Sequence, residues 1–500
     1  MPLTDPPSEP SSFADLERAT RGFRHVLDMA AALLRYLREQ QGRYAKLHHT
    51  FIADVRARFE PQAARVVADP ADWHFTQFAG DTRPADVLAG LKSVGPDERL
   101  VRARVFAESL DREYGGMFYD LFVADHPYDE WVPEPGDPVP RPFQQVRKEV
   151  ARPNETTTGV PRDLVAPSKL PEGVDVLPRL QLVPEAGRTH GKTFVFDTRF
   201  SHQLEELVGP YRQAQFHGLK IGTALLNERI DVATGVANNL VVNPGPHGAA
   251  TVYTVGPTTP AEQVRRMKAV LARAQRLGLD LLVFPELCTD KAGLDAVFAH
   301  YHASGSRCPK VFVGGSYHAG QANNATDPAR NQAEAAFSGV PNGTASHRKH
   351  EPYIFTSGGV TYTENLDREN VLRVYFSRNW HLSMLICLDA ITKARILDPL
   401  ALVGVNLLLV PALTDDVSSF RHLLVGYVQS TAALVVVANN PVLRSRPAGT
   451  VKDIHALFVT PERAPLDTPT QFKLKKGFNS PHLCWVILDD GRGPPQWVKC

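Results

Sequence analysis

The sequence predicts a layered α/β domain in its second half, preceded by a helical domain and a proline-rich segment. From residue 217 onward, short apolar runs typical of buried strands alternate with stretches of helical periodicity. Residues 12–125 show helical periodicity alone, and prolines recur between Pro127 and Pro184. A chain of 500 residues exceeds the usual size of one core, so two or three domains are expected. The predicted domains are a helical domain (1–125), a proline-rich extended linker (126–216), the α/β domain (217–490) and a short tail (491–500).

The helical domain is predicted from an apolar stripe with alternating spacings of three and four, from Leu16 to Leu37. Such a stripe is typical of a coiled coil or partner-binding helix, and equally of a helix in a local bundle. We favour the bundle. Further helical patterns lie at 85–91 and 100–122.

The proline-rich segment is expected to lack long helices and central strands, because proline removes a backbone donor. A short strand at 194–196 and a helix at 203–212 are its only predicted elements.

The α/β domain is predicted from apolar runs that alternate with helical patterns, as in layered sheets with buried strands. The expected helices are 261–277, 390–402 and 423–433. The expected strands are 219–226, 281–284, 311–314, 382–386, 407–410, 434–437 and 484–488.

Composition excludes several classes of protein. The 55 lysines and arginines nearly balance the 54 acids, so nothing indicates nucleic-acid or membrane binding. No signal peptide or membrane-length apolar run is visible. The five cysteines are odd in number and form no CxxC pair, which favours free thiols in a reducing, cytoplasmic compartment over a disulfide framework or a metal site.

Three residues with complementary chemistry each lie at the edge of a strand-like segment. Glu286 follows the apolar run 281–285, Lys349 lies in the sequence His-Arg-Lys-His, and Cys387 ends the run 382–386. A thiol at a strand-to-helix turn is typical of an exposed nucleophile. Each residue alone has an ordinary structural interpretation: a buried small residue for Cys387, a helix cap for Glu286 and a surface charge for Lys349.

The motifs around these residues resemble the nitrilase, or carbon–nitrogen hydrolase, superfamily. GLDLLVFPEL resembles its general-base strand, VFVGGSYH the next strand, NGTASHRKH its lysine segment, LSMLICLDA its nucleophile turn and STAALVVVANNP the strand that ends near the active site. The five pieces stand in the family's order and cover about residues 217–490. The resemblance implies a four-layer α-β-β-α sandwich that forms oligomers, and the first 216 residues show no such match.

The resemblance implies hydrolysis of a non-peptide C–N bond through a thioester, without a metal or organic cofactor. Cys387 is the implied nucleophile and Glu286 the general base, while Lys349 and the backbone N–H of Leu388 stabilise the oxyanion. The Cys-x-Asp pattern formed with Asp389 favours a small-molecule amide or carbamoyl substrate over a nitrile.

A second active-site glutamate is also implied, and Glu351 fits its pattern of Glu-x-x-x-Phe-x-x-Gly. Glu351 lies only two residues after Lys349, so it is either this glutamate or the partner of another nearby cation. Cys288 is interpreted as part of the pocket wall. The pair His347 and His350 is interpreted as polar pocket rim, because no further metal ligand is spaced to join it.

Two rival functions stay open. One is a catalytically weak or inactive scaffold in a regulatory or defence complex, whose N-terminal helices bind a protein partner. The other is an acyltransferase, in which an amine replaces water as the acceptor.

Overall fold

The structure is a computed structural model with two compact units, which are described separately. Unit 1 comprises residues 1–133, 139–150 and 169–185, and unit 2 comprises the remainder. The described residues are 13–20, 26–68, 83–114, 146–148, 180–182, 186–189, 192–200, 204, 207, 219–226, 230–231, 236–237, 240–247, 250–257, 259–306, 309–319, 330–338, 344–357, 359–364, 366, 371–376, 380–392, 396–414, 418–431, 433–440, 442–443, 454–459, 470–473, 485–489 and 496–499.

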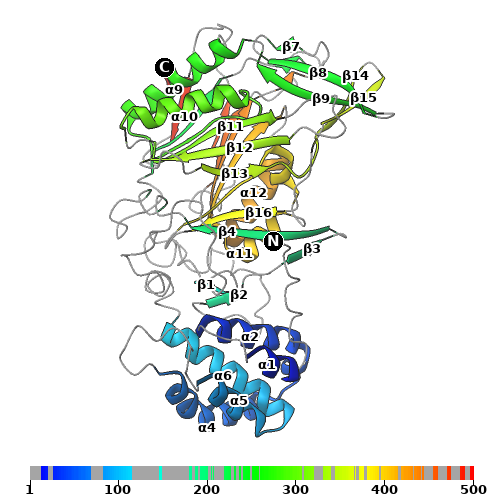
Figure 1. Cartoon of the computed structure of the whole chain (residues 1–500), viewed down its shortest axis with the longest axis vertical. Coiled ribbons are helices and arrows are strands. Elements are labelled where there is room, and N and C mark those ends of the chain that lie inside the picture. Colours follow the sequence, from blue (N-terminus) through cyan, green and yellow to red (C-terminus); the bar gives the residue numbers. More distant parts are fainter. Residues whose placement is uncertain are drawn as a thin grey trace. The chain divides into compact units, whose positions relative to one another are not determined.

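Unit 1 contains a helical bundle, drawn in blue to cyan in Figure 1. Helix α6 packs against α2, α4 and α5, and Phe59 on α4 meets Phe106 on α6 edge to face, with ring centroids 5.0 Å apart. Leu16, Leu33 and Leu37 of the predicted stripe are buried in this unit, as the bundle interpretation expects. The helices are α1 (Phe13–Thr20), α2 (Val26–Glu39), α3 (Gln41–Tyr44), α4 (His49–Val67), α5 (Arg83–Lys92) and α6 (Pro96–Tyr114).

The first sheet of unit 2 has seven strands and contains the run that leads to Glu286. Its central strands β5, β10 and β11 are parallel, as expected of buried strands that alternate with helices. Its order is β13 (Thr344–Arg348), β12 (Arg330–Phe337), β11 (Val311–Ala319), β10 (Leu281–Val283), β5 (Ile221–Leu225), β23 (Trp485–Asp489) and β24 (Gln496–Lys499).

The second sheet has eight strands and contains the run that leads to Cys387. Strands β17, β18 and β19 are parallel neighbours. Its order is β22 (Thr470–Lys473), β21 (Ile454–Val459), β19 (Leu434–Asn440), β18 (Leu407–Leu413), β17 (His381–Met384), β16 (Val371–Phe376), β4 (Lys192–Phe200) and β3 (Ala186–Thr189).

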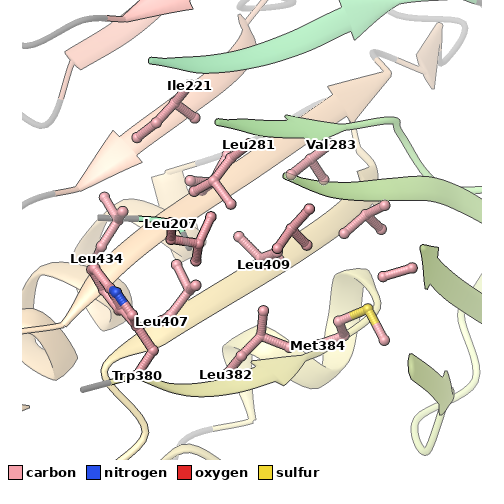
Figure 2. Close-up of a cluster of buried hydrophobic side chains, with 14 of the residues drawn as sticks. Leu207, Ile221, Leu281, Val283, Trp380, Leu382, Met384, Leu407, Leu409 and Leu434 are labelled. Carbon is pink, nitrogen blue, oxygen red and sulfur yellow. The ribbon is translucent and has the colours of Figure 1, made fainter. Parts of the chain in front are cut away.

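The two sheets pack face to face. Alternate residues of each strand, such as Leu281 and Val283 of β10, meet Leu407 and Leu409 of β18 in one buried cluster (Figure 2). Leu282, which lies between the first two, belongs to a separate cluster on the other face of its sheet. Because both faces of such a strand are buried, its residues form a continuous apolar run in the sequence.

Helices cover the outer faces. Helices α9 (Pro260–Leu277) and α10 (Lys291–Ala303) supply buried side chains to the cluster that contains Leu282, and both lie beside the first sheet in Figure 1. Helix α12 (Ser418–Thr431) packs on the second sheet through β19 and β21, and contacts α11 (Asp398–Val403). The predicted α-β-β-α layering is therefore confirmed.

A third sheet, which the sequence did not predict, completes the described part of unit 2. Its order is β14 (Ile354–Ser357), β15 (Val360–Glu364), β9 (Ala250–Pro257), β8 (Leu240–His247), β7 (Val236–Ala237), β6 (Ile230–Asp231) and β20 (Val442–Leu443). Prolines inside β8 and a strongly polar β15 conceal these strands from a pattern search.

Several predicted boundaries differ from the structure. Strand β4 pairs with β16 inside the second sheet, and β24 pairs with β23, so the sheets extend beyond the predicted limits of 217 and 490. Residues 192–200 contain no proline, which explains why a full strand forms within the predicted linker. Strands β1 (Val146–Lys148) and β2 (Leu180–Leu182) of unit 1 also pair there.

The predicted helix 390–402 is instead a short 3-10 helix, Cys387–Ile391, followed by α11. Of the predicted helix 203–212, only Leu204 and Leu207 fall within the described residues. Among the described helices, none is long and apolar enough to cross a membrane.

Candidate functional site

Glu286 lies in the turn that follows β10, at the carboxyl end of a buried parallel strand. Its backbone N–H donates to the carbonyl of Ala412 at the end of β18 (3.3 Å), so this turn joins the two sheets. The next residue, Leu287, has a left-handed backbone (φ 52°) and donates its N–H to Ser316 Oγ (3.0 Å). A strained non-glycine residue of this kind is held by its surroundings and is typical of functional turns.

Gly315 makes room for this turn. It has a φ of 79°, and a Cβ atom added there would lie 2.4 Å from both Cys288 Sγ and the carbonyl oxygen of Pro285. No other residue type fits without moving the segment that positions Glu286.

Cys387 occupies the corresponding turn after β17, at the start of the 3-10 helix Cys387–Ile391. Its φ of 46° is again left-handed, which directs the thiol out of the strand as in a nucleophile elbow. The Sγ atom lies 3.7 Å from the carbonyl oxygen of Leu413, and Glu286 lies close enough for its charge to raise the pKa of the thiol. The structure thus brings the predicted acid and the predicted thiol together.

Lys349 follows β13 and joins the same site. Its backbone N–H donates to the carbonyl of Asn331 (2.9 Å), and its Nζ donates to Glu286 Oε1 (2.7 Å) and to Glu364 Oε2 (2.6 Å). All three charged side chains are at most 2% exposed. In such a setting an ammonium between two carboxylates is held in one geometry.

Glu364, at the end of β15, is the site residue that the sequence analysis missed. It accepts hydrogen bonds from Lys349, from Asn331 Nδ2 (2.7 Å) and from the backbone N–H of Tyr353 (2.9 Å), and its Oε1 lies 3.1 Å from His318 Nε2. Asn331 Nδ2 also donates to Glu286 Oε1 (2.9 Å) and so bridges the two glutamates.

Glu351, the predicted candidate for a second glutamate, has a different place in the network. Its backbone N–H donates to Asp389 Oδ1 (2.9 Å), whereas Glu364 forms the ion pair with Lys349. The polar, alternating sequence of β15 resembles any exposed edge strand, so only its pairing with β9 in the third sheet indicates where Glu364 lies.

The two glutamates have pKa values shifted in opposite directions. Burial raises the pKa of Glu286, and the charge of Glu364 adds to the rise, although the Lys349 ammonium opposes it. Burial alone would also raise the pKa of Glu364, but Lys349 and His318 outweigh it and hold that pKa well below its usual range. At neutral pH, Glu364 is therefore the fixed counter-ion of Lys349, and Glu286 is the carboxyl suited to exchange a proton.

The thiols are not acidic in the resting site. Burial and the nearby Glu286 raise the pKa of Cys387 well above its usual value. Burial likewise raises the pKa of Cys288, whose Sγ lies 3.5 Å from the carbonyl of Gly314 in the packing beneath the turn. A thiolate at Cys387 consequently needs a proton acceptor at the moment of reaction.

Asp389 connects the thiol turn to the lysine segment. Its carboxylate accepts from the backbone N–H groups of His350 (3.1 Å to Oδ1) and Glu351, and lies 3.1 Å from His347 Nε2. Burial would raise the pKa of Asp389, but the hydrogen bond from His347 and the charges of both histidines lower it. A carboxylate two residues after Cys387 thus fixes the segment on which Lys349 lies.

Two other predicted features can be placed. The backbone N–H of Leu388 lies in the first turn of the 3-10 helix, where N–H groups have no acceptor within the helix. Within the described residues, no group of three or more His, Cys, Asp or Glu side chains is arranged to hold a metal ion.

Neither a protein-family model nor a curated protein sequence matches this chain. Among solved structures, an amidase from Nesterenkonia sp. is 18% identical over 56% of this chain and 92% of the amidase, with a TM-score of 0.37. A mutant of the Nesterenkonia sp. AN1 amidase from the nitrilase superfamily is 18% identical over 55% and 92%, with a TM-score of 0.36. Another mutant, with the acetamide moiety of fluoroacetamide added at its active-site cysteine, is 17% identical over 55% and 91%, with a TM-score of 0.35. These values describe a distant likeness in which about half of this chain aligns with nearly the whole amidase.

Proposed function

We propose that this protein is a cysteine-dependent hydrolase of a non-peptide carbon–nitrogen bond, with the nitrilase-like chemistry that its motifs resemble. The observation that carries the proposal is the buried cluster in which Lys349 Nζ bridges Glu286 and Glu364 beside the Cys387 thiol, whose pKa the nearby Glu286 raises. Burying three charged groups is costly, so a purely structural role is a poor explanation for them.

The first half-reaction forms a thioester. Glu286 accepts the thiol proton while the Cys387 sulfur attacks the carbonyl carbon, so no free thiolate has to exist beforehand. The tetrahedral intermediate then collapses: its C–N bond breaks, and the nitrogen leaves as an amine or ammonia after it receives the same proton from Glu286.

The second half-reaction restores the enzyme. Glu286 accepts a proton from water, the resulting hydroxide attacks the thioester carbon, and the C–S bond breaks. The sulfur takes the proton back from Glu286, and the acyl group leaves as a carboxylic acid. Glu286 therefore carries one proton in each direction, which its raised pKa suits.

The negative oxygen of each tetrahedral intermediate needs fixed donors. The Lys349 ammonium is such a donor, because the two glutamates hold it in place. We assign oxyanion stabilisation to Lys349 together with the backbone N–H of Leu388. Glu364 keeps Lys349 charged and oriented and does not itself exchange protons.

The substrate class is proposed from the same residues. The Cys-x-Asp pattern resembles the amidase and carbamoylase branches, so an amide or carbamoyl compound is favoured over a nitrile. Asp389 contributes by holding the lysine segment against the thiol turn.

Intact-mass analysis tests this function directly. Wild-type protein and the variant Cys387→Ala are incubated with amides, carbamoyl compounds and nitriles, and a thiol-alkylating probe is used in parallel. We expect an acyl adduct whose mass identifies the acyl group, present in the wild type and absent from Cys387→Ala. The variant Cys288→Ala is the matched control and should keep the adduct, because that thiol lies in the packing beneath the turn.

The same experiment separates the rival functions. An adduct that is released faster by added amines than by water, with an amide as product, would identify an acyltransferase. No adduct from any compound, and no preferential alkylation of Cys387, would contradict the proposal and favour an inactive scaffold whose N-terminal helices bind a partner.

A further inference from the structure

Asn440 ends β19, the strand next to β18 in the second sheet. Leu434, Val436 and Ala438 of the same strand lie in the cluster between the two sheets. Because side chains alternate along a strand, Asn440 lies on this inner face, at the carboxyl end where the Glu286 turn contacts β18. A polar side chain thus continues an otherwise apolar face at the edge of the site.

Both polar atoms of the Asn440 amide are buried and lack a hydrogen-bond partner within the described part of the chain. The preceding residue shows the contrast: Asn439 accepts from the backbone N–H of Thr414 (2.9 Å) and donates to its carbonyl (3.0 Å). An amide with neither group satisfied is unusual in a folded protein and requires an explanation, and a bound ligand would supply the missing partners.

Asn440 is also close to the nucleophile. In the parallel pairing of β18 and β19 its register partner is Leu413, and paired strands lie about 4.8 Å apart. The carbonyl oxygen of Leu413 is 3.7 Å from Cys387 Sγ. Asn440 therefore lies one strand away from the segment that contacts the nucleophile, within reach of the far end of an extended acyl group on this sulfur. Burial does not argue against this role, because Glu286, Lys349 and Cys387 are nearly as buried.

We propose that Asn440 binds the acyl part of the substrate and selects acyl groups that carry a second carboxamide or a ureido unit. This inference rests on the proposed function, in which Lys349 and Leu388 hold the reacting oxygen and Glu286 serves the reacting nitrogen. Asn440 then binds the part of the acyl group that lies beyond the reacting carbon. Its amide offers a donor and an acceptor side by side, which a second carboxamide satisfies with two hydrogen bonds.

Two amides of the same shape test the selection. Succinamide presents a second carboxamide, and 4-methylpentanamide has an isopropyl group in its place. The ratio of their kcat/KM values is measured for full-length wild type and for Asn440→Leu, which keeps the side-chain shape and removes both polar groups. We expect wild type to favour succinamide, and the ratio to fall by roughly tenfold or more in Asn440→Leu.

Two further variants keep the test decisive. Thr223→Val removes a different buried polar group, the Thr223 hydroxyl on β5, which also lacks a partner among the described residues. This variant should leave the ratio of kcat/KM values unchanged. Asn440→Asp keeps the acceptor and loses the donor, so it should also lower the ratio, and it replaces Asn440→Leu if that variant does not fold.

The outcomes separate this inference from the proposed function. An equal ratio in wild type and the Asn440 variants, with acyl adducts still forming on Cys387, overturns the role of Asn440 alone. If wild type forms no adduct with either amide or with any other amide or carbamoyl compound, the proposed function fails and this inference fails with it.

Discussion

Replacing Glu364 by glutamine removes one negative charge from the centre of the site and changes the shape little. Glu364 is 1% exposed and Lys349 is 2% exposed, so the lost charge cannot be replaced by solvent. The glutamine amide would also place its N–H₂ group or its weaker carbonyl acceptor against Lys349, whose ion pair with Glu286 remains.

The size of the effect follows from burial. Breaking a buried ion pair by removing one partner lowers the unfolding free energy by about 3–5 kcal/mol. This figure includes the loss of the hydrogen bonds that Asn331 and Tyr353 donate to the same carboxylate. The matched control is Glu262→Gln, because Glu262 forms salt bridges with Arg265 and Arg266 on the surface of α9. That variant should lose less than about 1 kcal/mol.

Urea unfolding followed by tryptophan fluorescence measures the difference at several pH values. Because the pKa of Glu364 is lowered in the folded protein, its charge stabilises the fold above the ordinary value of 4.5, and this contribution is lost as the pH falls further. The gap between wild type and Glu364→Gln should thus be full at pH 7 and shrink in acid. The gap between wild type and Glu262→Gln should stay small at every pH.

A double-mutant cycle with Lys349→Met gives the result that would refute this reasoning. If Lys349 and Glu364 act as a pair, the double variant loses less stability than the two single variants added together. Additive losses, or a Glu364→Gln variant that unfolds at the same urea concentration as Glu262→Gln, would show that the ion pair is not the basis of the site.

Three further predictions concern other parts of the site. Glu286→Gln should lower kcat by roughly 10²–10⁴-fold as measured by product release, because it removes the proton carrier. Its pH effect on stability has the opposite sign to that of Glu364: a raised pKa makes the Glu286 contribution decrease as the pH rises above 4.5, so the variant should gain stability relative to wild type in that range. Asp389→Asn should lower both kcat and the acylation rate of the thiol, and lower the unfolding free energy by about 1–3 kcal/mol, because a buried carboxylate that accepts backbone N–H groups is lost. Gly315→Ala should destabilise the protein by about 1–3 kcal/mol in thermal unfolding, because φ is positive and the new methyl group would meet Cys288 Sγ at 2.4 Å.

A specific result would contradict each of these predictions. Unchanged turnover in Glu286→Gln would remove that residue from the chemistry. An Asp389→Asn variant with normal acylation would show that the link to the lysine segment is dispensable. A Gly315→Ala variant as stable as wild type would show that the turn can move. Gly305→Ala is the control: its φ is also positive, but nothing lies near its Cβ position, so it should lose only the unfolding free energy that corresponds to the backbone strain.

The sequence alone predicted the parts of this protein that depend on local patterns. The strand runs that end at Glu286 and Cys387 are continuous in the sequence because both faces of a buried parallel strand are apolar. Helix α9 begins and ends within a residue of its predicted limits, since proline begins it and the left-handed Gly278 ends it. Lys349 could be proposed only from its neighbours and their order, because a lysine in a polar segment carries no local sign of burial.

Tertiary structure decided everything that depends on residues distant in the sequence. Glu364 reaches Lys349 because β15 pairs with β9 in a sheet whose strands contain prolines or polar residues, and no local pattern marks it. The opposite pKa shifts of Glu286 and Glu364 exist only when one ammonium lies between two buried carboxylates. Nothing in the sequence distinguishes Asn440 from an asparagine with satisfied hydrogen bonds. Only its burial at the end of β19 leaves its amide without a partner among the described residues. Sequence periodicity determines which faces are buried, whereas charge, burial and hydrogen bonding at a site depend on which distant segments the fold brings together.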